Sequence, residues 1–202
     1  MKKHIALLLL ALICSVNLVE AGGEKSYIRK IKKHRKQTAK MFADPAQSPM
    51  RADAVHFEGL DYFDIDPAYR VMARVEMTPS EEPFMMPTSK ADLPKKFVQY
   101  GILHFELQGQ ELQLPMYVRA SQRENPQYIF VPFTDLTTGA ECYGGGRYLD
   151  VEVPKPGEEL EVDFNLCYNP YCAYGDGWAC PIPPRANFLN IRVEAGVKNY
   201  QH

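Results

Sequence analysis

The sequence contains no apolar run long enough to cross a bilayer as a helix. Its longest apolar run, from about residue 5 to residue 18, holds about 14 residues, whereas a spanning helix needs about 20. Internal repeats and low-complexity segments are also missing, and contents of 46% hydrophobic and 24% charged residues are ordinary for a globular protein. Multi-pass membrane proteins, collagen-like chains and disordered chains are therefore excluded.

Closely spaced cysteine pairs are missing as well. A four-cysteine zinc site needs pairs such as Cys-x2-Cys, but the gaps between Cys142, Cys167, Cys172 and Cys180 hold 24, 4 and 7 residues. The sequence therefore predicts no metal site, and no motif in it calls for a cofactor.

The N-terminus has the pattern of a secretion signal. Two lysines precede the apolar run, and Val-Glu-Ala at its end fits cleavage between Ala21 and Gly22. The alternatives are a retained anchor or lipidation at Cys14, which bulky Ile13 disfavours. We predict a signal peptide over residues 1–21 and an exported protein, periplasmic or extracellular. Because disulfides form outside the cytosol, the four remaining cysteines are disulfide candidates, paired as Cys172–Cys180 and Cys142–Cys167.

Positive charge is concentrated directly after this segment. Residues 22–42 contain eight Lys or Arg and one Glu, a net charge of +7, whereas residues 43–202 carry −10. Apolar residues recur at helical spacing from about 25 to 42, and Asp44-Pro45 ends the pattern. Such a helix could contact a membrane surface or nucleic acid. We favour a solvated helix that complements the acidic body, with no nucleic-acid partner.

Strand patterns dominate the remaining chain, whose length fits one domain. Apolar and polar residues alternate in most of these runs, and residues 128–133 are apolar on both sides, as in a central strand. The predicted strands are 69–77, 103–107, 111–118, 128–133, 147–153, 159–165 and 188–194, with a turn at 108–110. At least seven short strands and one helix predict a mainly β protein. We expect an antiparallel β sandwich or barrel over residues 43–202, preceded by one N-terminal helix.

Strands 147–153 and 159–165 are predicted to pair as one hairpin. The register that collects the apolar residues on one face sets Asp150 opposite Asp163 on the other. Two facing carboxylates could bind a cation such as calcium, share a proton in acid–base catalysis, or lie solvated on a wet face. We favour the solvated arrangement.

A glycine-rich turn precedes this hairpin. Gly144, Gly145 and Gly146 permit positive φ angles and exposed amides, and Arg147 could bind a carboxylate or phosphate. The turn is not a P-loop, because no Lys-Ser/Thr pair follows it. The alternative is a tight turn in which Arg147 pairs with a nearby carboxylate.

Two further features could carry chemistry. A catalytic cysteine needs a base that makes the thiolate, and the sequence places no histidine beside Cys172. An aromatic loop could stack on a planar ligand or cap the end of the core, and we favour capping. Its members are Tyr168, Tyr171, Tyr174 and Trp178.

The ordered set of motifs resembles the bacterial family catalogued as domain of unknown function 1684. The matching segments are Phe57–Arg70, Met86–Ser89, Tyr100-Gly101, Phe130–Asp135, Tyr143–Asp150, Asp163–Asn165, Tyr168–Tyr174, Cys180-Pro181, Pro183-Pro184, Asn187 and Ala195-Gly196. The resemblance covers the chain beyond the signal and implies no established activity, so it transfers no catalytic residue. Cys142 and Cys167 depart from the family pattern.

These observations predict a non-enzymatic envelope protein that binds a small polar or anionic ligand. The predicted ligand-binding residues are Gly144, Gly145, Gly146, Arg147, Tyr148, Asp163, Asn165 and Asn169. Two alternatives stay open: a hydrolase-type enzyme that uses Asp150 with Asp163 or uses Cys172, and an interaction protein that docks through its basic helix. The sequence predicts no oligomeric state.

Overall fold

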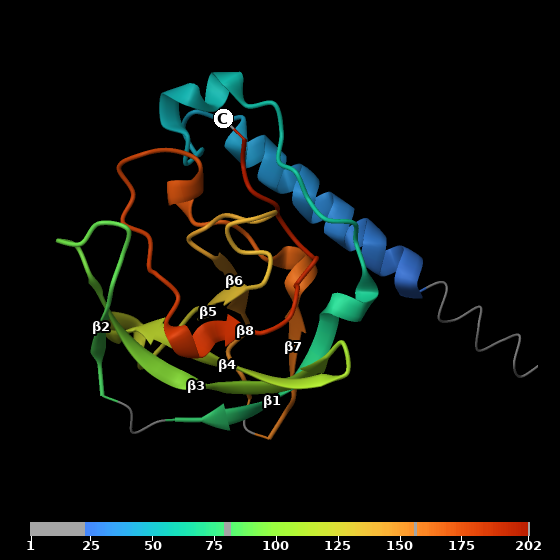
Figure 1. The fold of residues 1–202 in the computed structure, drawn as a ribbon, viewed down its shortest axis with the longest axis vertical. Coiled ribbons are helices and arrows are strands. Elements are labelled where there is room, and N and C mark those ends of the chain that lie inside the picture. Colours follow the sequence, from blue (N-terminus) through green and yellow to red (C-terminus); the bar gives the residue numbers. More distant parts are fainter. Residues whose placement is uncertain (1–22, 79–81, 156, 202) are drawn as a thin grey trace, which may run out of the picture. The chain divides into compact units, whose positions relative to one another are not determined.

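The computed structural model describes residues 23–78, 82–155 and 157–201, so the predicted signal peptide lies outside the described residues. The chain divides into two units between residues 38 and 39, and each is described by itself. A helix runs from residue 23 to residue 42 (Figure 1), close to the predicted 25–42. No helix in the described part of the chain has both the length and the apolar composition needed to cross a membrane.

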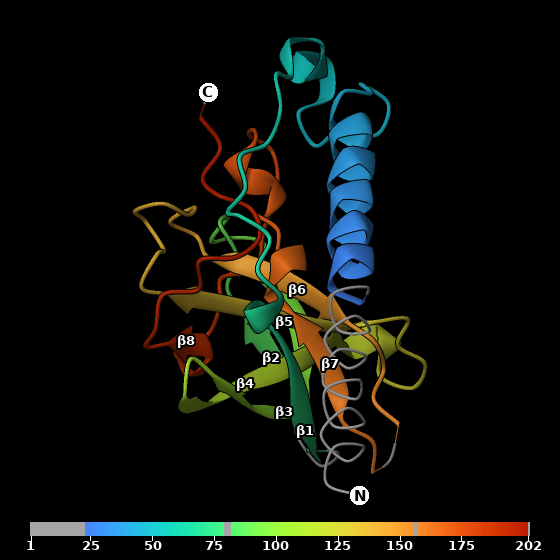
Figure 2. The same cartoon turned by 90° about the vertical axis from the view of Figure 1, so that its right-hand side faces the viewer.

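One eight-stranded sheet forms the framework of residues 39–202, and Figures 1 and 2 show it curled into a half-barrel. The strands are β1 (Arg70–Met77), β2 (Phe84–Met86), β3 (Lys95–Leu107), β4 (Gln110–Arg119), β5 (Ile129–Asp135), β6 (Arg147–Val151), β7 (Leu160–Asp163) and β8 (Phe188–Leu189). Six of them follow the order β6-β5-β4-β3-β1-β7, while β2 pairs with β3 and β8 pairs with β5. The predicted mainly β fold with one N-terminal helix is confirmed.

Short 3-10 helices fill the connections. They are η1 (Arg51–His56), η2 (Pro67–Tyr69), η3 (Ala120–Gln122), η4 (Phe164–Leu166), η5 (Tyr171–Ala173) and η6 (Arg185–Asn187).

The hairpin between β3 and β4 shows how the local sequence sets a turn. Gln108 and Gly109 have φ angles of 54° and 71°, as a two-residue type I′ turn requires. Leu107 therefore pairs with Gln110, and the alternation on both strands places Phe105 and Leu114 in the core. The predicted turn at 108–110 is confirmed.

Both faces of the central strand β5 are buried, as predicted. Ile129, Val131 and Phe133 belong to the main core, which also takes in Leu103, Leu114, Met116, Val162 and Phe164. On the opposite face, Phe130 joins an aromatic cluster with Phe97, Tyr117 and Tyr148. This second cluster explains why β5 reads as apolar on both sides.

The predicted hairpin between β6 and β7 is wrong. β6 pairs with β5, and β7 pairs with β1, so the two strands stand at opposite ends of the strand order. Alternation determines which residues of a strand share a face, but it does not determine the partner strand. Asp150 therefore lies opposite Phe130, and Asp163 lies opposite Arg70.

The predicted last strand, 188–194, shortens to the two residues of β8. The alternation beyond it is real, because Ile191, Val193, Ala195 and Val197 are buried. No named strand of the described chain pairs with this stretch. The carbonyl groups of Val193 and Ala195 bond to a buried side chain, and those of Ile191 and Gly196 accept backbone N–H groups from Leu136 and Phe63.

Candidate functional site

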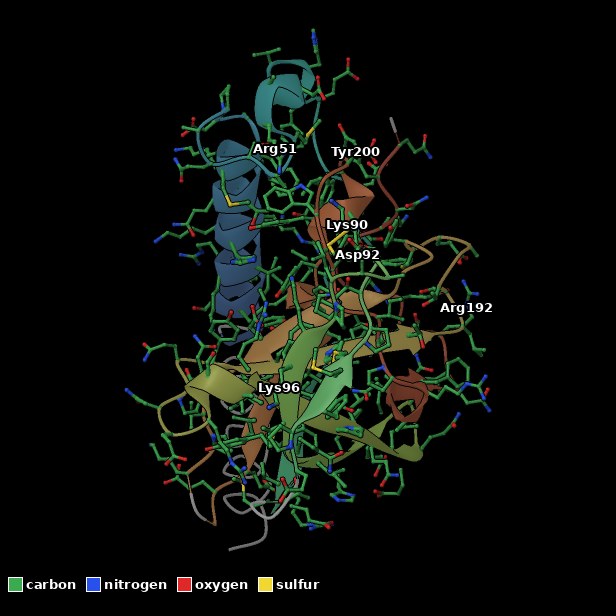
Figure 3. The ribbon with its side chains drawn as sticks, turned by 90° about the vertical axis from the view of Figure 1, so that its left-hand side faces the viewer. Arg51, Lys90, Asp92, Lys96, Arg192 and Tyr200 are labelled. Atoms are coloured by element: carbon green, nitrogen blue, oxygen red, sulfur yellow. A yellow bond between two sulfur atoms is a disulfide. The ribbon has the colours of Figure 1, made fainter. Side chains whose placement is uncertain are left out.

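Arg147, the predicted anion ligand, lies inside the core with 0% of its surface exposed. Its guanidinium donates hydrogen bonds to the carbonyl oxygens of Val193 (2.8 Å) and Ala195 (2.5 Å). It also pairs with the buried carboxylate of Asp135 at 3.4 Å. Arg192 on the same C-terminal segment lies at the surface (Figure 3), where it pairs with Glu141 and Glu194. The internal bonds of Arg147 thus replace a missing partner strand.

Cys142 and Cys167 are free thiols, so the predicted second disulfide is wrong. The sulfur of Cys167 donates to the carbonyl oxygen of Ala195 at 3.4 Å, and that of Cys142 donates to Val197 at 3.8 Å. Burial raises the pKa of both thiols, that of Cys167 to about 11. Each sulfur stays protonated and contacts a different carbonyl of the C-terminal segment.

The remaining predicted polar ligands also bond within the fold. Asp163 accepts the N–H of Asn165 (3.0 Å) and so caps η4. The amide of Asn165 donates to the carbonyl oxygen of Asp66 (2.8 Å) and accepts the N–H of that residue (3.1 Å). Asn169 donates to the carbonyl oxygen of Lys198 at 2.9 Å. These side chains fasten irregular segments to the sheet.

The glycine turn is constrained by packing against backbone at Gly146 and against the ring of Tyr143 at Gly145. Gly146 has a φ of 80°, and a Cβ atom there would lie 2.6 Å from the carbonyl oxygen of Phe133. A Cβ atom on Gly144 would meet nothing closer than 3.9 Å. Beyond the turn, the hydroxyl of Tyr148 donates to Pro181. The turn therefore delivers Arg147 to the core, and ligand binding by these residues stays a prediction.

The two carboxylates proposed for catalysis do not face each other. Asp150 accepts a hydrogen bond from the hydroxyl of Tyr168 at 2.7 Å, whereas Asp163 bonds to Asn165. Partial desolvation raises the pKa of Asp150, while the bond from Tyr168 acts to lower it. Within the described residues, no group of three or more His, Cys, Asp and Glu side chains is placed to hold a metal ion.

The predicted disulfide between Cys172 and Cys180 is present, with a Cα–Cα distance of 6.3 Å. Ser89 fastens the loop that it closes: its hydroxyl accepts the N–H of Cys180 at 3.0 Å and lies 3.0 Å from the sulfur of Cys172. A bridged sulfur has no thiolate, so Cys172 would act as a nucleophile only after reduction.

The aromatic loop divides into two parts. Tyr168 packs edge-on against Tyr148, and Tyr174 packs against Phe42 with ring centroids 4.6 Å apart, as expected for capping. Tyr171 is 40% exposed and packs on Trp178 at 4.9 Å.

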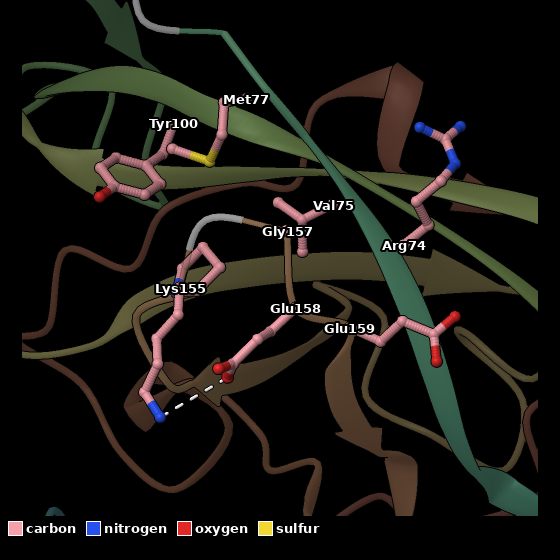
Figure 4. A pocket seen from close by; sticks show the side chains of 9 residues that line it. Arg74, Val75, Met77, Tyr100, Lys155, Gly157, Glu158 and Glu159 are labelled. Carbon is pink, nitrogen blue, oxygen red and sulfur yellow. Dashed lines mark ion pairs between the residues drawn. The ribbon is translucent and has the colours of Figure 1, made fainter.

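A cavity of about 410 Å³ lies beside β1 (Figure 4). It is lined by Arg74, Val75 and Met77 of β1, Tyr100 of β3, and Pro154, Lys155, Gly157, Glu158 and Glu159 of the connection from β6 to β7. The sequence predicted none of these residues as part of a site. The alternation over 69–77 predicted the strand, but a gap beside a strand has no sequence signal of its own.

The cavity combines an apolar wall with a charged rim. Val75, Met77 and Tyr100 supply the wall. The rim holds two basic side chains, Arg74 and Lys155, and two acidic ones, Glu158 and Glu159, and Lys155 pairs with Glu158 at 3.5 Å (Figure 4). Arg74 and Glu159 form no ion pair with any described residue. The rim thus carries one positive and one negative side chain with no ion pair to another described residue.

Comparison with known proteins identifies the family. Residues 55–198 match the model of a family described as "Protein of unknown function (DUF1684)". The chain belongs to this family. An uncharacterized protein of Haloarcula marismortui, solved by solution NMR, is similar: 34% identity, a TM-score of 0.67, and coverage of 86% of this chain and 95% of that chain. No curated protein matches the chain.

The DUF1684 match covers some features of this chain and leaves the basic helix outside. It begins at residue 55 and ends at residue 198, so it contains the whole sheet, the disulfide, Arg147 and the cavity. The basic helix precedes the match. A function common to DUF1684 proteins would therefore depend on the sheet and its connections.

Proposed function

We propose that this DUF1684 protein is a non-enzymatic, exported binding protein that holds a small polar ligand in the cavity beside β1. The observation that carries the proposal is the cavity itself. Its volume of about 410 Å³ lies within the range of roughly 300–1,000 Å³ that is usual for ligand sites. The predicted polar residues around Arg147 form hydrogen bonds inside the fold, so we propose the cavity as the ligand site in their place.

The charges of the rim favour a neutral or zwitterionic ligand over a strongly anionic one. Lys155 is already paired with Glu158, which leaves Arg74 and Glu159 as one positive and one negative group. A polyanion would meet both glutamates, whereas a ligand with both signs, or with neutral polar groups, complements the rim.

The geometry gives the hydrolase alternative no support. Asp150 and Asp163 belong to strands at opposite ends of the strand order, and Cys172 is bridged. A general acid–base pair needs both groups within reach of one substrate.

A thermal-shift screen tests the proposal. The panel contains single amino acids, blocked dipeptides, sugars, organic acids and nucleotides, each added in excess. A ligand at about 100 times its Kd stabilises the folded state by about 2.7 kcal/mol. That corresponds to a rise in Tm of about 5–10 °C for a domain of this size.

Two matched variants locate the binding. Arg74→Ala removes a rim charge, and we expect it to weaken a panel ligand about fivefold, the value of one hydrogen bond. Lys96→Ala removes an exposed charge of β3 that does not line the cavity (Figure 3), and binding should stay unchanged. Equal affinities for Arg74→Ala and Lys96→Ala would move the site elsewhere, and a panel without any ligand would refute the proposal.

A further inference from the structure

The cavity runs along the edge of β1. Its lining takes Arg74 from one face of the strand and Val75 and Met77 from the other, since successive side chains point to opposite faces. Figure 4 shows these side chains along one stretch of β1. A space that reaches both faces lies beside the strand and not above it.

One side of this stretch has no partner strand. β1 pairs with β7 through Arg70–Ala73 and with β3 through Arg74–Met77. The pairing with β7 ends at Ala73 and Leu160, where the connection from β6 arrives. Among the described residues, no backbone hydrogen bond joins 74–77 to 154–155 or 157–159. The edge of β1 is therefore open where the cavity lies.

The backbone groups of Val75 and Met77 face this open edge. In an antiparallel ladder, the N–H and C=O of one residue point to the same side, and the side alternates along the strand. The N–H of Thr78 donates to Tyr100 (3.2 Å), and a Cβ atom on Gly101 would lie 2.6 Å from the carbonyl oxygen of Glu76. Residues 76 and 78 thus turn to β3, so Val75 and Met77 present two donors and two acceptors to the cavity.

We propose that the ligand is a short extended peptide segment that adds to β1 as a strand, an inference that rests on the proposed function of the cavity. Donors and acceptors of an extended chain repeat every second residue, about 6.8 Å apart, which matches the spacing from Val75 to Met77. Tyr100 and Met77 offer an apolar surface to one ligand side chain. Sugars and organic acids lack this repeat.

The opposite wall of the cavity selects a single chain. Lys155, Glu158 and Glu159 of the connection from β6 to β7 line the same space, and Figure 4 shows Lys155 and Glu158 away from the strand. Because these side chains line the same space, we expect it to take one peptide segment and not the whole sheet edge that dimerisation through β1 would require.

Binding of a positional library of acetylated, amidated tetrapeptides to the full chain tests the inference. We expect some pools to bind, and the best peptide to lose affinity about 5–10-fold when the N–H that faces β1 is methylated. Methylation of the adjacent N–H, which points away from β1, is the matched control and should change little. Equal effects of the two methylations would overturn strand addition.

Amide hydrogen exchange of the unsubstituted protein supplies a second readout. The amides of Val75 and Met77 should exchange quickly in the free protein and become protected with peptide, while Glu76 stays protected throughout. Met77→Pro deletes a donor that does not serve β3, so it should fold and bind about 5–10-fold more weakly than Met77→Ala.

The outcomes separate this inference from the function on which it rests. A sugar or organic acid that needs Arg74, together with tetrapeptides that do not bind, would overturn the peptide ligand and keep the cavity as the site. Protection of Val75 that rises with protein concentration alone would indicate a second copy of the chain and overturn the inference. If neither peptides nor other panel compounds bind, both proposals fail.

Discussion

Replacement of Arg147 tests whether the predicted anion ligand is a structural group. In Arg147→Met the buried carboxylate of Asp135 loses its ion pair, and the carbonyls of Val193 and Ala195 lose their donors. Removing one partner of a buried ion pair costs about 3–5 kcal/mol, and each orphaned buried carbonyl adds about 1–3 kcal/mol. We expect a loss of about 5 kcal/mol or more in the free energy of unfolding.

Urea denaturation followed by circular dichroism measures this loss. With a urea dependence of about 2 kcal/mol per molar, the midpoint should fall by about 2 M or more. The matched control is Arg192→Met on the same segment. Arg192 is half-exposed in its ion pairs, so its loss should cost no more than about 1 kcal/mol.

A double variant isolates the buried charge. Asp135→Asn keeps an acceptor for the N–H of Val193 but removes the unpaired charge, so Arg147→Met combined with Asp135→Asn should recover about 1–3 kcal/mol of the loss. Arg147→Met with wild-type stability and abolished ligand binding would refute the structural role and restore Arg147 as a ligand residue.

Three further predictions concern other parts of the fold. Gly146→Ala should destabilise the protein by about 3 kcal/mol, because residue 146 has a positive φ and the new Cβ atom would contact Phe133. Gly144→Ala should destabilise it by less than about 0.5 kcal/mol. A wild-type urea midpoint for both variants would contradict the packing constraint at Gly146. Reduction of the Cys172–Cys180 disulfide should lower the free energy of unfolding by about 2–3 kcal/mol and the calorimetric Tm by about 5–10 °C. The Tm of the variant with serine at both positions should not change when dithiothreitol is added. Because the pKa of Asp150 is raised in the folded state, its stabilising contribution is complete at pH values below its unfolded pKa and is lost as pH rises through the folded pKa. Asp150→Asn keeps an acceptor for Tyr168 and should raise the urea midpoint slightly near pH 7 and not near pH 3; a lower midpoint at neutral pH would contradict this sign.

Features set by neighbouring residues could be predicted from the sequence. Alternation over 69–77 gave β1 within one residue, and the turn at Gln108 and Gly109 set the register of the hairpin between β3 and β4. The apolar run near 128–133 indicated a strand buried on both faces, and β5 is one. Cys172 and Cys180 are separated by a short loop, so their pairing with each other could be predicted from the sequence.

Features set by distant partners could not be predicted in the same way. The alternating residues of β6 and β7 are compatible with many partner strands. Only the complete sheet shows that β6 pairs with β5 and that β7 pairs with β1. Arg147 appeared to be a surface ligand because it follows three glycines, but its role depends on a segment almost 50 residues later. The cavity forms because β1 pairs with β7 only as far as Ala73 but with β3 as far as Met77. No single stretch of sequence predicts where these two pairings end.

An NMR titration of the isotope-labelled protein with the strongest ligand of the screening panel shows directly whether the ligand binds beside β1. We expect the perturbed amides to cluster at residues 74–77, at Tyr100 and at 157–159, with little change at the glycine turn. Shifts confined to 144–148, Asn165 and Asn169, with the edge of β1 unaffected, would contradict it.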